Sequence, residues 1–161
     1  MTVMLLLKLI VVSVASVAVI DLWQRLFHRL GGLPPTNWSV VGRWLQILLR
    51  DRIVFNTSLQ ITQPMAGEAK AGWLLHYGVG GIYVITFYVL WQQLNMVSPI
   101  WQDGLLFGVL SVAIPWFFFM PALGAGVLAH KTPRPVLACT GALLTHSIFG
   151  LAIAAFMAAI F

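Results

Sequence analysis

The chain has 161 residues, of which 60% are hydrophobic and only 8% are charged, and its mean hydropathy is +0.94. A water-soluble domain needs far more polar surface, so the composition excludes a soluble globular protein and predicts an integral membrane protein. The net charge of +5 does not indicate a nucleic-acid partner, because the basic residues flank apolar segments, where membrane orientation and anionic lipids select them.

Four apolar segments are long enough to cross a bilayer, which takes about 20 residues as a helix. They cover residues 3–30, 72–94, 104–129 and 136–161. We therefore expect a single all-α domain over residues 1–161, with four transmembrane helices in a bundle.

The first segment ends in charged residues on one helical face. Asp21 lies four residues before Arg25, and opposite charges at this spacing meet on a helix surface. A pair between Asp21 and Arg25 within the helix is the simplest prediction. The alternative is that Asp21 faces the interior of the bundle.

Between the first two spans, residues 38–50 (WSVVGRWLQILLR) place apolar side chains at helical spacing and basic ones on the opposite side. This pattern predicts a short amphipathic helix in the inner membrane interface. We expect four of its residues to contact lipid headgroups: Trp38, Arg43, Trp44 and Arg50. The alternative is a lid that packs over the mouth of the bundle.

The second and fourth spans each carry a histidine with small residues four positions before and after it. The two sets are Gly72, His76, Gly80 and Ala142, His146, Gly150. Small residues at this spacing let helix backbones approach closely, so we expect both sets at helix contacts and both imidazoles inside the bundle. The simplest role for each ring is a hydrogen bond between helices.

The third span contains Pro115 and Pro121, and Gly124 follows shortly after. Proline inside a helix lacks a backbone donor and bends the helix. We therefore expect a kink or hinge at these three residues.

Lysine and arginine are concentrated in the first and third loops, whereas residues 95–103 contain none. By the positive-inside rule, the basic loops face the cytoplasm and both termini face the periplasm of a bacterial inner membrane. Most ionisable groups of the bundle then lie in its cytoplasmic half, which predicts a polar pocket that opens inward. We expect five residues to form it: Asp21, Glu68, His76, Tyr77 and His146.

Such a pocket favours the binding or translocation of a small ligand. We expect a homo-oligomer, because four helices enclose little space, and partners that are membrane lipids with anionic headgroups at the cytoplasmic face. One alternative is a haem or metal redox protein with His76 and His146 as ligands. The other is a lipid-modifying enzyme that uses Asp21 or Glu68 with a histidine.

Recognisable catalytic signatures and metal-ligand motifs are missing, so the sequence favours a protein that is not an enzyme. It predicts no metal-ligand residues and leaves the cofactor unknown. The single cysteine, Cys139, rules out an internal disulfide and a thiolate cluster.

Several short motifs are spread over nearly the whole chain. They are IDLW (20–23), VGRW (41–44), GEAKAGWLLHY (67–77), PALGAG (121–126), TPRP (132–135) and THSIFG (145–150). In this combination the chain resembles a group of bacterial inner-membrane proteins of about this length that are classed as a domain of unknown function. The resemblance implies a four-helix membrane fold and assigns no activity.

Overall fold

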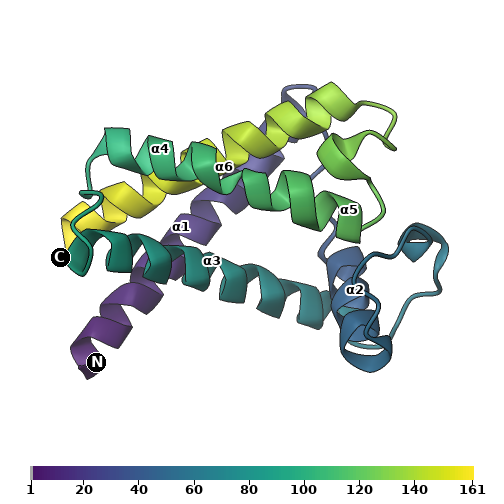
Figure 1. The fold of residues 1–161 in the computed structure, drawn as a ribbon, viewed down its shortest axis with the longest axis horizontal. Coiled ribbons are helices and arrows are strands. Elements are labelled where there is room, and N and C mark those ends of the chain that lie inside the picture. Colours follow the sequence, from purple (N-terminus) through teal and green to yellow (C-terminus); the bar gives the residue numbers. More distant parts are fainter. Residues whose placement is uncertain (1) are drawn as a thin grey trace.

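The computed structural model describes residues 2–161, with the backbone alone for Gln60, and its long elements are helices (Figure 1). Four helical segments are long and apolar enough to cross a membrane, which confirms the predicted all-α membrane fold. They are α1 (Val3–Arg29), α3 (Glu68–Gln92), the segment Trp101–Ala122 and α6 (Pro135–Ile160). The remaining helices are α2 (Trp38–Asp51) and the 3₁₀ turns η1 (Leu59–Ile61) and η3 (Val127–Ala129).

The third span is irregular. It consists of α4 (Trp101–Ser111), the π-helix η2 (Pro115–Phe119) and α5 (Met120–Ala122). The distortion expected from Pro115 and Pro121 thus takes the form of a wider π-helical turn, in which the Met120 N–H bonds to the Pro115 carbonyl.

The third span ends at Ala122 instead of residue 129. The N–H of Gly124 bonds to the Pro121 carbonyl, and the N–H of Ala125 bonds to the Met120 carbonyl. These two bonds form a Schellman motif, which requires a left-handed residue at Gly124, where φ is +86°. Gly124 therefore terminates the span and does not act as a hinge within it.

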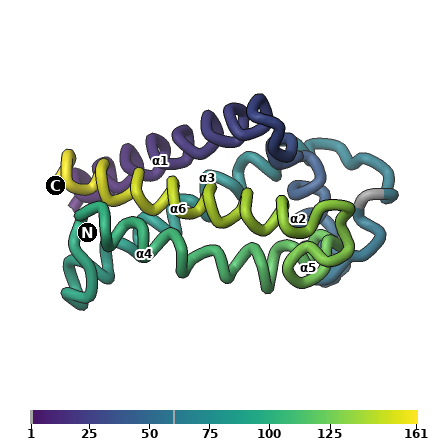
Figure 2. The backbone as a smooth tube through the Cα atoms, turned by 90° about the horizontal axis from the view of Figure 1, so that it is seen from above, coloured from purple at the N-terminus to yellow at the C-terminus, as the bar shows by residue number. Residues whose placement is uncertain are grey.

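The helix contacts centre on α1, α3 and α6. Helix α1 lies against both α3 and α6, α4 packs along α6, and α2 packs on α3. Both termini lie at one end of the bundle, whereas α2 and α5 lie at the other end (Figures 1 and 2). The two histidine-bearing helices, α3 and α6, therefore both pack on α1, and Tyr83 of α3 also contacts α6 directly.

The main apolar core joins α1, α3 and α6. Its buried residues are Leu9, Val12, Val17, Ile20, Val84, Phe87, Phe149, Ile153, Ala154 and Met157. A smaller cluster lies beneath α2 and consists of Trp44, Ile47, Leu59 and Ala122.

Glycine permits two close helix crossings. A Cβ atom on Gly72 of α3 would overlap the backbone oxygen of Trp38 in α2. A Cβ atom on Gly150 of α6 would overlap the backbone oxygen of Gly104 in α4. Of the small residues predicted at helix contacts, Gly72, Gly80 and Gly150 lie at contacts with α2, α1 and α4, respectively. Ala142 lies at a cavity instead.

The amphipathic helix predicted at residues 38–50 is present as α2, but it packs against α3. Arg43 is 6% exposed and Trp44 is 3% exposed, so the prediction that these two side chains contact lipid headgroups is wrong. Protein groups satisfy them instead: Arg43 pairs with Glu68, and the Trp44 indole donates to the Val54 carbonyl. The structure matches the alternative of a lid at the mouth of the bundle.

Candidate functional site

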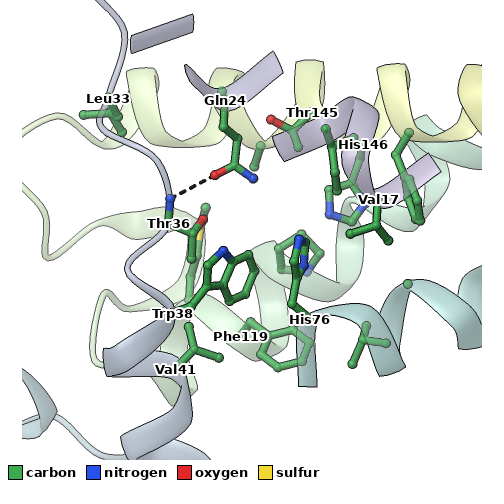
Figure 3. Close-up of a pocket in the computed structure, with 18 of the residues that line it drawn as sticks. Val17, Gln24, Leu33, Thr36, Trp38, Val41, His76, Phe119, Thr145 and His146 are labelled. Atoms are coloured by element: carbon green, nitrogen blue, oxygen red, sulfur yellow. Dashed lines mark hydrogen bonds between the residues drawn. The ribbon is translucent and has the colours of Figure 1, made fainter. Parts of the chain in front are cut away.

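A cavity of about 360 Å³ lies in the half of the bundle next to α2 and α5 (Figure 3). Helices α1, α3, α6, η2 and α5 and the segment from residue 33 to residue 41 contribute to its walls. This volume falls in the range of small-molecule pockets, which is about 300–1,000 Å³.

Apolar side chains make up most of the lining, which differs from the polar pocket that the sequence predicts. The polar lining residues are Gln24, Thr36, Trp38, His76, Tyr83, Thr145 and His146. None of the lining residues is Asp, Glu, Lys or Arg. The cavity is therefore an apolar space with a small set of uncharged or imidazole groups.

The five residues expected in the pocket separate into three places. His76 and His146 both line the cavity. Asp21 and Tyr77 are outside the lining and contact His76 and each other, whereas Glu68 is held by Arg43. The carboxylates thus bind protein groups and do not face the cavity.

His76 is fixed by two neighbours. Its Nε2 atom lies 2.9 Å from Oδ1 of Asp21, and its ring stacks on the Trp38 indole with centroids 3.8 Å apart. The Tyr77 hydroxyl lies 3.4 Å from the second Asp21 oxygen. The Asp21 carboxylate therefore joins α1 to α3.

The predicted pair of Asp21 with Arg25 within α1 is wrong, because the carboxylate turns to the imidazole on α3. Arg25 is exposed and can remain in water, whereas the largely enclosed Asp21 needs partners inside the protein. The i,i+4 spacing alone does not show this difference in surroundings.

His146 lies on the α6 side of the cavity and binds α4. Its Nδ1 atom is 2.8 Å from the Ser111 hydroxyl, which also lies 2.7 Å from the Gly108 carbonyl oxygen. The Tyr83 ring packs edge-on against the imidazole, with centroids 5.8 Å apart. Sequence reasoning missed Ser111, since one serine in a membrane helix carries no distinctive signal.

Gln24 was also missed by sequence reasoning. Its side-chain oxygen accepts a hydrogen bond of 2.9 Å from the Thr36 backbone N–H, so its amide nitrogen faces the other way, toward the cavity (Figure 3). A helix-terminal glutamine is common, and only the return of the chain at Thr36 reveals its orientation.

Arg43 anchors α2 over the first turn of α3. Two of its nitrogens bind the Glu68 carboxylate at 2.8 and 3.1 Å, and a third donates to the Thr62 carbonyl at 2.6 Å. The hydrogen bond with Glu68 is the main reason that the pKa of Arg43 is raised above its ordinary value. A bidentate pair of this kind fixes the relative orientation of its two side chains, so Glu68 of α3 helps to hold α2 in place over the bundle.

Metal ligation was one alternative for the histidines. Among residues 2–161, no group of three or more His, Cys, Asp or Glu side chains is arranged to hold a metal ion. The two lining histidines instead bind protein partners from different helices, Asp21 and Ser111.

Fold and cavity together define a multi-pass α-helical membrane protein of four spans with a mainly apolar pocket that contains no Asp, Glu, Lys or Arg. The sequence model of the family DUF2938, described as a protein of unknown function, matches residues 10–160, and the chain belongs to this family. No curated protein and no solved structure matches the chain.

Proposed function

We propose that this protein binds a small, uncharged and mainly apolar molecule in the cavity between α1, α3 and α6. The observation that carries the proposal is the lining itself, which combines apolar side chains with a few polar groups and contains no formally charged Asp, Glu, Lys or Arg. This composition is typical of sites that bind small organic molecules.

Charge separates this ligand class from others. An ion without a partner of opposite charge is costly to bury in apolar surroundings, and the lining offers no carboxylate, ammonium or guanidinium group to compensate it. An uncharged molecule that dissolves in the membrane pays no such penalty.

The enclosed positions of the carboxylates argue against the lipid-modifying enzyme. Asp21 binds His76, and Glu68 binds Arg43, so neither is free to act on a molecule in the cavity. The ligand-binding function needs only the lining residues.

We also propose that the cavity lies in the cytoplasmic half of a bacterial inner membrane. The basic loops adjoin α2 and α5, and the positive-inside rule assigns that end to the cytoplasm. The exposed Arg50 there is suited to anionic headgroups. Alkaline phosphatase fused after Phe161 should be active, because it works in the periplasm. An inactive phosphatase fusion, together with a fluorescent fusion of green fluorescent protein at the same position, would show the opposite orientation.

The binding function is tested by filling the cavity. Ala142 lines it on α6, whereas Ala155 is exposed on the same helix. Isothermal titration calorimetry in lipid nanodiscs should show that uncharged 1-naphthol binds the parent protein and Ala155→Phe, with empty nanodiscs as the blank. Ala142→Phe should weaken this binding at least tenfold.

The charged analogue 1-naphthalenesulfonate completes the test. It should not bind in the cavity, because its sulfonate would lose water without gaining a partner. Equal binding of 1-naphthol to the two phenylalanine variants, or tight binding of the sulfonate that depends on Ala142, would overturn the proposal.

A further inference from the structure

We propose that the ligand of this cavity carries a hydroxyl or N–H group, and that this group donates a hydrogen bond to Nε2 of His146. The inference rests on the proposed binding function and specifies its ligand class: an apolar molecule with a hydrogen-bond donor. It follows from the hydrogen-bonding partners of the two histidines.

The Ser111 hydroxyl determines which nitrogen of His146 carries the proton. Its oxygen lies within hydrogen-bond distance of both the Gly108 carbonyl and Nδ1 of His146. A carbonyl oxygen only accepts, so the single hydroxyl proton goes to Gly108. Nδ1 of His146 must then donate to Ser111, and the neutral ring has an unprotonated Nε2 atom with a lone pair.

No described residue donates to this lone pair. Ser111 is the hydrogen-bond partner of His146, and the His146 side chain lines the cavity (Figure 3). The Tyr83 ring packs edge-on against the imidazole. Ser111 of α4 and Tyr83 of α3 thus hold the His146 ring of α6, and we infer that its Nε2 acceptor faces the cavity of about 360 Å³. An acceptor in apolar surroundings is satisfied best by a donor that the ligand brings.

His76 presents a different nitrogen to its surroundings. Asp21 binds its Nε2 atom and Trp38 covers one face of its ring, so only Nδ1 has no hydrogen-bond partner among the described residues. Another polar group of the lining is the Gln24 amide nitrogen, which donates and so selects for an acceptor on the ligand. In this proposal, Nε2 of His146 accepts a hydrogen bond from the ligand, and the Gln24 amide nitrogen donates one to it.

Two probes of nearly equal shape distinguish a donor from a non-donor. 1-Naphthol has a hydroxyl proton, whereas 1-methoxynaphthalene has none. By calorimetry in nanodiscs, the parent protein should bind 1-naphthol about three- to tenfold more tightly, as expected for one neutral hydrogen bond. His146→Phe should still bind both probes and lose the preference between them.

Two serine variants test the role of Ser111. Ser111→Ala releases the ring to protonate Nε2, so the preference for 1-naphthol should fall. Ser13 is the matched control, because it is also 9% exposed and donates to a carbonyl of its own helix, that of Leu9, at the same 2.7 Å. Ser13→Ala should keep the full preference.

The outcomes separate this inference from the proposed function. If the parent protein binds both probes equally, or if His146→Phe keeps the preference, the donor assignment is wrong and the binding function stands. If the parent protein binds neither probe, both proposals fail. Should Ser111→Ala not fold, the comparison of His146→Phe with the parent protein decides the question.

Discussion

The surroundings of His76 and His146 differ although the two histidines occupy matching sequence patterns. The Nε2 atom of His76 contacts Asp21, and one face of its ring stacks on Trp38. His146 binds Ser111 through Nδ1 and keeps its other nitrogen toward the cavity. Both rings therefore join two helices, and the Nε2 atom of His146 is the nitrogen that we propose contacts a ligand.

The helix crossings next to the two rings explain this difference. At His76, glycine brings α2 so close to α3 that a tryptophan from α2 covers the ring. At His146, glycine brings α4 close to α6, and the side chain that α4 supplies is a small serine. The large partner covers one face of the His76 ring, whereas the small partner contacts the His146 ring at Nδ1.

The largest effect is expected where α2 packs on α3 next to His76. Gly72→Ala places a Cβ atom against the Trp38 backbone oxygen, and a backbone atom cannot move aside as a flexible side chain can. We expect a loss of about 3 kcal/mol in the free energy of unfolding, at the upper end for overpacking. Reversible unfolding in mixed micelles measures it.

Gly78 of the same helix provides the control for this change. A Cβ atom there meets nothing within 4 Å, so Gly78→Ala should leave stability unchanged or slightly raised through better helix propensity. If both alanine variants behave alike, α2 does not pack on α3 as described.

A smaller effect is expected at the link between α1 and α3. Asp21→Ala leaves Nε2 of His76 and the Tyr77 hydroxyl without their acceptor, which should cost about 2 kcal/mol in the free energy of unfolding. Asp51→Ala serves as its control, because the pair of Asp51 with Arg50 is exposed and should contribute little. Equal effects of the two variants would refute a structural role for Asp21.

The smallest effect sharpens the comparison between the two rings. His76→Phe should lower thermal stability and keep the preference for 1-naphthol, because the acceptor on His146 is unchanged. His146→Phe should change thermal stability less and reduce that preference about fivefold, which corresponds to roughly 1 kcal/mol. Calorimetry and thermal unfolding of both variants in the same nanodiscs give the two readouts, and an exchange of the two phenotypes would reverse our assignment.

Local sequence patterns predicted the spans because hydropathy is itself local. The four apolar segments and the inward position of both histidines follow from the sequence alone. The end of the third span was readable in principle, since Gly124 three residues after Pro121 is a helix-ending signal.

Partners far along the chain determined what the sequence did not show. Arg43 lies 25 residues from Glu68, Asp21 lies 55 from His76, and Ser111 lies 35 from His146. An amphipathic helix fits a lipid surface and a protein surface equally well. The pair of Arg43 with Glu68 therefore decides that α2 packs on α3. The mainly apolar lining of the cavity likewise depends on tertiary packing.

Nitrogen-15 NMR of histidine-labelled protein in nanodiscs tests the central claim most directly, with resonances assigned by single His→Gln variants. We predict that His146 is protonated on Nδ1, and that its unprotonated Nε2 resonance moves when 1-naphthol is added. His76 should show a protonated Nε2 that does not respond. Protonation of His146 on Nε2, or a response at His76 alone, would contradict the account.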